Sequence, residues 1–428
     1  MISTSRSIPP SGSWISASGR GSGIAASGEL GLSSLNPAAN GESTMPVLNS
    51  IADSAEQIAT WRRHIHQNPE IGLHCVKTAA FVAERLREIG ADEIHESIGR
   101  TGIVALIKGR GDGPVLGLRA DMDALPMPET TGKEYASRVE GAMHACGHDG
   151  HTAMLLGAAK YLAGTRNFAG TVALIFQPAE ETGEGAKAML AEGIMDRFDI
   201  ERVFGIHTSP MHDLGQFTTR TGPLMAAVGD FDILIKGRGG HGAYPQRAAD
   251  PVAAALVMGN ALQTIVSRNV DASDEVVLSI TNIHAGSAFN VIPAEARLGG
   301  TIRSFSTEAR DLVRRRMREI CEGVAAAMGC TVEIRSTIDI DPTVNHEAET
   351  ALAIEVAKAV SGCEIAPHPH MGGEDFGAML GERPGAFLFL GQGKGPMVHE
   401  TDFDFNDAAA PIGASFFAKL VERALPLT

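Results

Sequence analysis

Apolar positions near the start of the patterned chain follow helical spacing. Further along, short continuous apolar runs alternate with segments of helical spacing. Between about residues 54 and 89 the pattern predicts two helices, broken at Pro69 and ending at Gly90. Beyond them, buried strands are predicted at 102–109, 114–121, 171–178 and 202–209, with helices at 151–164 and 185–195. Strands that alternate with helices predict an α/β fold with a mostly parallel sheet flanked by helices on both faces.

The pattern changes after Gly222. Strands are predicted at 230–240, 275–286, 295–305 and 331–338, and helices at 250–269 and 307–329. Asp250 and Pro251 form a suitable N-cap and first turn for the first of these helices. The order strand, helix, strand, strand, helix, strand is that of a ferredoxin-like α+β domain. Because residues 346–362, 385–391 and 408–425 return to the first style, this α+β domain is predicted to be an insertion.

Four segments follow from these patterns. The first, residues 1–44, is rich in Ser and Gly without any period, which predicts a disordered tail and favours Met45 as the true start. The α/β domain is predicted at 45–222 and 339–428, and the inserted domain at 223–338.

Composition narrows the class of protein. The 428 residues are 44% hydrophobic, but the sequence contains no uninterrupted apolar run of about 18 residues, so no membrane span is predicted. The net charge of −15 argues against a nucleic-acid partner, which needs clustered Lys and Arg. Five widely spaced cysteines form no disulfide framework, so a cytoplasmic location is expected.

Acids and imidazoles follow the predicted strands of the α/β domain. Because ligands bind beyond the carboxyl ends of such strands, these side chains are expected to meet at one edge of the sheet. They are Asp121 and Asp123 after 114–121, Glu180 and Glu181 after 171–178, His207 within 202–209 and His399 after 385–391, with Cys146 and His148 at the start of a helix.

Thiolate, imidazole and carboxylate are ligands of zinc-like divalent ions. Cys146 precedes a helix, whose N-terminus is expected to lower the pKa of the thiol, and a shared thiolate or carboxylate could hold two ions. Adjacent glutamates are most often a solvated turn. After a buried strand, however, one of Glu180 and Glu181 could bind metal while the other acts as a base.

The chain resembles the M20 metallopeptidases, in the branch of hippurate hydrolases, N-acyl-amino-acid amidohydrolases and auxin-conjugate hydrolases. The resemblance covers nearly the whole chain from Trp61 onward. It rests on the segments RRHIHQNPEIG, GLRADMDALPMPE, HACGHDGHTAMLLGAA, IFQPAEETGEGAKAML, GRGGHGAYP, DPVAAA, FNVIP, GTIRSF, GGEDF and FDFND.

The resemblance implies a role for each matching residue. It makes Glu180 the general base and proton donor, and Asp123 a group that orients a ligand from behind. Metal ligands would be Cys146, shared by two ions, His148, Glu181, His207 and His399. Substrate would be held by His241, reaching a site across a dimer, and by Asn290 and Arg303.

Simpler interpretations stay open for several of these residues. His241 could cap a glycine-rich turn, and Arg303 could be a solvent-facing charge on its strand. His151 is the strongest rival ligand, since it lies three residues after His148 on the same helical face.

The expected protein is therefore a homodimeric, metal-dependent amidohydrolase that cleaves N-acyl amino acids. It would bind two divalent ions, Mn, Zn, Co or Ni, with the inserted domain as lid and dimerisation domain. The alternatives are a dipeptidase or N-acetyl or succinyl deacylase of the same superfamily, and a metal-binding protein without catalysis.

Overall fold

The computed structural model describes residues 48–427. The tail predicted at 1–44 and the start proposed at Met45 lie outside the described residues. No described helix combines the length and apolar character needed to cross a membrane.

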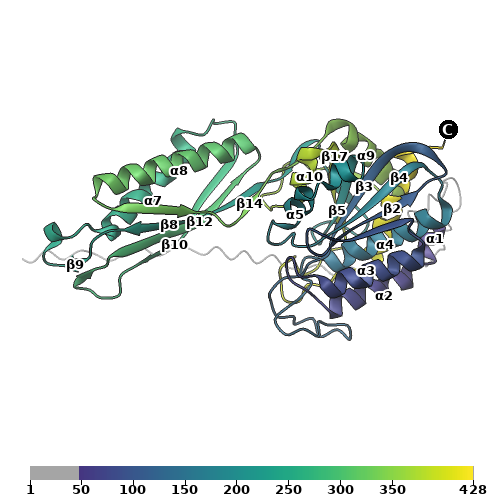
Figure 1. The fold of residues 1–428 in the computed structure, drawn as a ribbon, viewed down its shortest axis with the longest axis horizontal. Helices are drawn as coiled ribbons and strands as arrows, with labels where there is room; N and C mark the ends of the chain where they lie inside the picture. The colour runs from purple at the N-terminus through teal and green to yellow at the C-terminus, as the bar shows by residue number, and fades with distance from the viewer. Residues whose placement is uncertain (1–47, 428) are drawn as a thin grey trace, which may run out of the picture. The chain divides into compact units, whose positions relative to one another are not determined.

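A large sheet with four parallel central strands forms the central layer of the α/β part of the fold (Figure 1). Its order is β1-β2-β4-β3-β5-β17-β6-β16, and the pairs β4–β3, β3–β5 and β5–β17 are parallel. The eight strands are β1 (Glu93–Ile98), β2 (Gly102–Lys108), β3 (Gly111–Asp121), β4 (Ala169–Gln177), β5 (Ile200–Ser209), β6 (Phe217–Thr219), β16 (Cys363–Ile365) and β17 (Gly385–Gly391). The predicted mostly parallel sheet is confirmed, although the predicted strand 102–109 runs antiparallel to β4 as β2.

Helices cover both faces of this sheet because alternate strand residues point to opposite sides. On β2, Ile103 joins one hydrophobic cluster and Val104 the other. One face packs against α1 (Asn49–Ala52), α2 (Ala55–Gln67), α3 (Val76–Ile89), α4 (His148–Thr165), α9 (Glu347–Val360) and α11 (Ala410–Ala424). The other face packs against α5 (Gly185–Ala191), α6 (Ile194–Arg197) and α10 (Phe376–Glu382).

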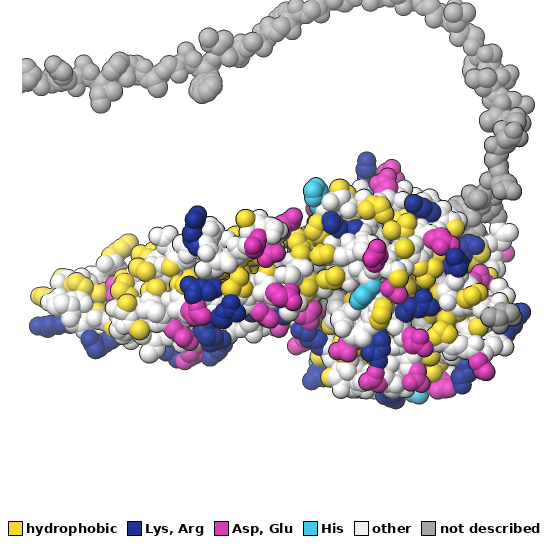
Figure 2. Space-filling view, turned by 90° about the horizontal axis from the view of Figure 1, so that it is seen from above, with side chains coloured by type: hydrophobic (Ala, Val, Ile, Leu, Met, Phe, Trp, Pro, Cys, Tyr) yellow, Lys and Arg dark blue, Asp and Glu magenta, His cyan; other side chains and the backbone are white. Residues whose placement is uncertain are grey.

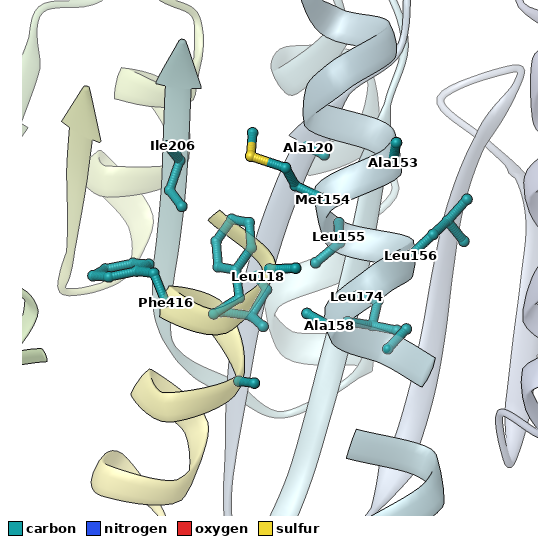
Figure 3. Close-up of a cluster of buried hydrophobic side chains, with 14 of the residues drawn as sticks. Leu118, Ala120, Ala153, Met154, Leu155, Leu156, Ala158, Leu174, Ile206 and Phe416 are labelled. Carbon is teal, nitrogen blue, oxygen red and sulfur yellow. The ribbon is translucent and has the colours of Figure 1, made fainter. Parts of the chain in front are cut away.

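Helix α4 is buried on almost every side, between the sheet and α2 and α11. Figure 3 shows its Leu155 and Ala158 among Leu118 of β3, Leu174 of β4 and Phe416 of α11. A helix that is apolar all round must be buried in this way. The packing fixes the N-terminus of α4, where the candidate site begins.

A second, antiparallel sheet is built by the middle of the chain, with α7 (Pro251–Arg268) and α8 (Thr307–Ala327) packed on it (Figure 1). Its order is β10-β12-β8-β13, with β14 added to β8. The strands are β8 (Ala227–Lys236), β10 (Val276–Ala285), β12 (Glu295–Ser304), β13 (Thr331–Arg335) and β14 (Asp339–Ile340). This is the predicted ferredoxin-like arrangement, and the Asp250 side chain caps α7 by accepting from the N–H of Val252 at 2.8 Å.

Short elements complete the described chain. They are β7 (Gly222–Met225) paired with β15 (Thr343–Asn345), β9 (Gly240–His241) paired with β11 (Val291–Ile292), and two 3₁₀ turns, η1 (Pro245–Arg247) and η2 (Asp407–Ala409). We keep the segments 45–222, 223–338 and 339–428 as a proposal for the domains. The second boundary falls just before β14, which still pairs with the second sheet.

One predicted helix is two in the structure. The segment 185–195 divides into α5 and α6 because Gly193 takes the left-handed conformation, with φ of 71°.

On the face drawn in Figure 2, acidic and basic side chains are interspersed.

Candidate active site

The four parallel strands β4, β3, β5 and β17 place the candidate residues at one edge of the first sheet. Asp121 is the last residue of β3, and Glu180 and Glu181 follow β4 after a short turn. His207 lies near the end of β5, and α4 begins at His148. The carboxyl ends of parallel strands meet at the same edge, as the sequence pattern predicted.

Cys146 lies at the centre of the candidate ligands. Its Sγ is 3.2 Å from Nε2 of His207. Donor atoms of Cys146, His148 and His207 all lie within 4.8 Å of one another, and so do those of Cys146, Glu181 and His399. The structure thus brings all five predicted ligands together in two groups that share one sulfur atom.

Two buried polar atoms in these groups have no hydrogen-bond partner. They are Nε2 of His148 and Oε1 of Glu181, whose nearest basic neighbour is Nε2 of His399 at 3.5 Å. A buried polar atom without a partner is costly, and a cation would satisfy both. Sulfur, imidazole nitrogen and carboxylate oxygen are donors that suit zinc-like ions, so these residues fit divalent cations.

The prediction that the helix N-terminus lowers the pKa of the Cys146 thiol is wrong for this arrangement of side chains without a cation. Burial, followed by the Glu181 carboxylate, raises the pKa of Cys146 well above its ordinary value. Both effects disfavour the thiolate. A cation would therefore have to supply the charge that stabilises the thiolate.

Backbone carbonyl groups fix the tautomers of two candidate ligand histidines. Nδ1 of His148 lies 2.9 Å from the Asp123 carbonyl oxygen, and Nδ1 of His207 lies 2.6 Å from the Thr208 carbonyl oxygen. Because a carbonyl only accepts, each Nδ1 must donate. In both rings the Nε2 lone pair is left facing the site.

The rival ligand His151 has no nitrogen to spare. Its Nδ1 is 2.6 Å from Oδ1 of Asp121, and its Nε2 accepts from the N–H of Thr208 at 2.8 Å. Both ring nitrogens are therefore used inside the protein, which argues against His151 as a ligand. His151 instead joins the end of β3 to the end of β5.

Asp123 holds the turn that carries the two glutamates. Its Oδ1 accepts from the N–H of Glu180 at 3.0 Å, and its Oδ2 accepts from the N–H of Glu181 at 3.2 Å. Ala179, just before them, has a φ of 56°, which is uncommon for a residue with a side chain. Both glutamates reach His148, but their other neighbours differ, since Glu181 groups with Cys146 and His399 while Glu180 groups with a pair of acids.

Those acids are Glu374 and Asp375, which the sequence analysis quoted within GGEDF without giving them a role. Donor oxygens of Glu180, Glu374 and Asp375 lie within 4.8 Å of one another. Burial, and then the Glu374 carboxylate, raise the pKa of Glu180 well above its ordinary value. Two adjacent acids beside a buried apolar segment were the available signal for this cluster.

Arg119 of β3 lies beneath the same acids and was also missed. The guanidinium is fully buried and lies 2.7 Å from Asp121, 2.9 Å from Glu374 and 3.0 Å from Asp375. A charged residue inside an otherwise buried strand was the signal, because such a charge is almost always paired.

The predicted substrate-binding residues lie outside the ligand groups: Arg303 is on β12 of the second sheet, whereas His241 and Asn290 lie at the separate β9–β11 pair. His241 pairs with Val291 in β9–β11, and Asn290 lies beside it, since its carbonyl accepts from Gly242 N–H at 2.8 Å. Arg303 lies near the end of β12, whereas the β9–β11 pair lies near its start at Glu295. Arg303 is eight residues beyond Glu295, which is about 26 Å at the rise of a strand. The structure brings His241 and Asn290 together and separates them from Arg303.

Comparison with known proteins places this geometry among related enzymes. The family described as peptidase family M20/M25/M40 matches residues 117–423. Hippurate hydrolase of Campylobacter jejuni is 41% identical over 384 residues, which cover 89% of this chain and 100% of that protein. N-acetylcysteine deacetylase of Bacillus subtilis is 38% identical, covering 86% of this chain and 98% of that protein. The crystal structure of the YXEP protein of Bacillus subtilis, described as a dinuclear metal-binding peptidase, matches with a TM-score of 0.76 and 36% identity, covering 87% of this chain and 99% of that one.

Proposed function

The chain belongs to peptidase family M20/M25/M40, and we propose from this membership that it is a metal-dependent amidohydrolase of N-acyl amino acids. It would cleave the amide bond of small, hippurate-like substrates and release a carboxylic acid and a free amino acid. The observation that carries the proposal is the thiol of Cys146 shared by two donor groups, with the buried carboxyl of Glu180 next to them.

Two divalent ions would be held by Cys146, His148, Glu181, His207 and His399. Mn, Zn, Co or Ni would suit this donor set, since all accept imidazole and carboxylate ligands. When bound, such ions polarise a carbonyl group and lower the pKa of water toward about 7.

Glu180 would move the proton of the reaction. It accepts a proton from the water that attacks the amide carbon, and it donates that proton to the amine nitrogen as the C–N bond breaks. A raised pKa suits the second step, in which the carboxyl donates, whereas bound cations would lower the pKa of Glu180 and so favour the carboxylate that the first step needs. Asp123 supports this role by fixing the backbone of Glu180.

Arg303 would bind the carboxylate of the substrate. Its guanidinium is half-buried, and among residues 48–427 no carboxylate forms an ion pair with it. Burial alone lowers the pKa of Arg303, which an incoming anion would reverse. A planar guanidinium with several donors matches the two oxygens of a carboxylate.

His241 and Asn290 would act in a homodimer. β10 is the edge strand of the second sheet and exposes 54% of Ile283, and α7 exposes 65% of Leu256. An apolar sheet edge is prone to pair with a second copy of the chain. Pairing there would carry His241 and Asn290 toward the site of the other subunit, where His241 would stabilise the oxyanion.

The dimer proposal is tested by Ile283→Lys, which places a charge on the edge strand. We expect the variant to be monomeric in analytical ultracentrifugation and to lose hydrolysis, while exposed Val139→Lys in the first domain leaves both unchanged. A variant that stays dimeric would count against this edge as the interface.

Glu180→Gln tests the reaction itself. The amide cannot take a proton, so kcat should fall by about 10²–10⁴-fold while metal content, measured by mass spectrometry, stays normal. Unchanged turnover would rule out Glu180 as the base. Loss of activity with EDTA and its return with Zn²⁺, Mn²⁺ or Co²⁺ would exclude a metal-binding protein without catalysis.

Two further points complete the proposal. Hippurate, N-acetyl and N-succinyl amino acids and dipeptides, compared by kcat/KM, would separate the proposed activity from a dipeptidase or another deacylase. We also infer a cytoplasmic location, because all five cysteines are free and Cys146 must stay reduced to bind metal.

A further inference from the structure

One buried arginine, Arg62, lies behind two of the candidate metal ligands. Arg62 of α2 exposes 1% of its side chain and contacts three carboxylates. Its Nε donates to Asp407 at 2.7 Å, and its Nη1 donates to Asp404 at 3.0 Å and lies 3.6 Å from Asp149. Arg62 lies in the segment RRHIHQNPEIG and has no part in the proposed mechanism.

Each of these carboxylates belongs to a segment that carries a ligand. Asp149 directly follows His148 in the first turn of α4. Asp404 and Asp407 lie in the segment that follows His399. Arg62 therefore joins the backbone behind one ligand to the backbone behind the other.

His399 depends on this support more than the other ligands do. Its side chain is 53% exposed, and its φ of 68° is in the left-handed region. One backbone hydrogen bond ties it to the ligand loop, from the His399 N–H to the Ala145 carbonyl at 2.8 Å. The position of its imidazole thus follows from how the segment behind it is held.

Other contacts hold the same segment to the start of α4. The Tyr135 hydroxyl donates to Asp404 at 2.7 Å, and its ring lies 4.5 Å from the Arg62 guanidinium. The ring of Phe405 packs so tightly on Gly150 that a Cβ there would overlap it. On the far side of Asp149, the His66 imidazole lies 2.8 Å from the carboxylate.

We propose that Arg62 is a positioning residue that fixes His399 relative to His148 and so sets the affinity of the site for divalent cations. The inference rests on the proposed function, because it takes both histidines as metal ligands. Arg62 suits the task because its rigid, planar guanidinium has five donors and can engage three carboxylates at once. Without it, Asp149 keeps His66, whereas Asp404 and Asp407 keep only contacts with Tyr135, Lys133 and Arg63, none of which reaches Asp149, so the segment loses its direct link to α4 through Asp149.

The test is Arg62→Met in the full chain, with Co²⁺ as the probe. Metal-free protein is titrated with Co²⁺, and the near-ultraviolet absorption of cobalt bound to the Cys146 thiolate reports binding. We expect Co²⁺ to bind about 10–100-fold more weakly than to the unsubstituted chain, as for other residues that orient metal ligands. Arg62→Lys, which keeps the charge but loses the planar geometry, should lie between the two.

Arg63→Met is the matched control. Arg63 is the next residue, is 49% exposed and contacts Asp407 at 2.7 Å, but it reaches neither Asp149 nor Asp404 in the described contacts. It should bind Co²⁺ like the unsubstituted chain. Urea unfolding of each metal-free variant separates a loss of folding from a loss of affinity.

The outcomes discriminate clearly. A folded Arg62→Met variant with unchanged Co²⁺ affinity overturns the inference, and so does an equal loss in Arg63→Met. If Arg62→Met does not fold, Tyr135→Phe removes only the hydroxyl contact to Asp404, and a weaker Co²⁺ complex supports the inference while an unchanged one overturns it. Failure of the unsubstituted chain to bind Co²⁺ would remove the proposed function as well, whereas normal binding by both chains removes only the role of Arg62.

Discussion

Replacing Asp123 tests how the turn that carries Glu180 and Glu181 is held. The fully buried carboxylate accepts from both of their backbone N–H groups, at 3.0 and 3.2 Å. In Asp123→Ala both donors lose their acceptor, and both lie in a turn with little access to water. We expect the turn to lose its fixed geometry.

The magnitude follows from the number of bonds. A hydrogen bond to a charged group contributes about 1.5–3 kcal/mol, so two contribute about 3–6 kcal/mol. Burial, with the Glu181 carboxylate, raises the pKa of Asp123, which shows that part of this gain is offset by the cost of burying the charge. We therefore expect Asp123→Ala to lower the free energy of unfolding by about 3 kcal/mol, the lower end of that range.

Asp123→Asn should cost about half as much, because its amide keeps one acceptor oxygen and turns an NH₂ group toward the second donor. Turnover should fall by at least about 10²-fold in both variants, since small misplacement of a reacting group has effects of that order. Exposed Asp112 of β3, replaced by Ala, is the matched control and should change neither quantity.

Urea unfolding of the metal-free chain followed by circular dichroism gives the free energies, and hydrolysis of hippurate in the presence of Mn²⁺ gives kcat. Equal stabilities for Asp123→Ala and Asp123→Asn would refute the count of two acceptors. Normal turnover in Asp123→Ala would refute the view that this carboxylate positions Glu180.

Two further predictions concern the core around α4. Burial disfavours the charged His66, but the carboxylates of Asp149 and Glu129 outweigh it and raise the pKa of His66 to about 9. The stabilisation of the folded chain by charged His66 is complete below pH 6.5 and is lost as the pH rises through about 9, and it amounts to about 3 kcal/mol at most. The difference in free energy of unfolding in urea between the unsubstituted chain and His66→Gln should therefore shrink over that range. A difference that stays constant with pH would contradict this prediction. Gly150→Val would drive a side chain into the ring of Phe405 and should lower stability by about 1–3 kcal/mol in the same assay, whereas a variant as stable as the unsubstituted chain would show that the segment can yield.

The sequence alone was sufficient to predict the central parallel strands and the edge at which the candidate ligands meet. β3, β4, β5 and β17 were each predicted from a short apolar run, and each is followed or ended by residues of the site. Periodicity reports which residues are buried, and parallel strands place their carboxyl ends together, so both results need only local information. The ligand set needed the family resemblance in addition, because Cys-x-His and Glu-Glu pairs are common by chance.

What the tertiary structure decided was which partner each polar group has. His151 and His148 share a helical face, but only the folded chain shows that Asp121 and Thr208 use both nitrogens of His151. Glu374 and Asp375 lie far along the chain from Glu180 and still meet it.

The same holds for Arg62, which lies more than 340 residues from Asp404 and Asp407 in sequence and yet bonds to both. Hydrogen bonds and ion pairs act over about 3 Å, so their partners depend on how distant segments are brought together by packing of the apolar core. The pattern of apolar residues determines that packing as a whole, but it does not specify, residue by residue, which polar atoms will face each other.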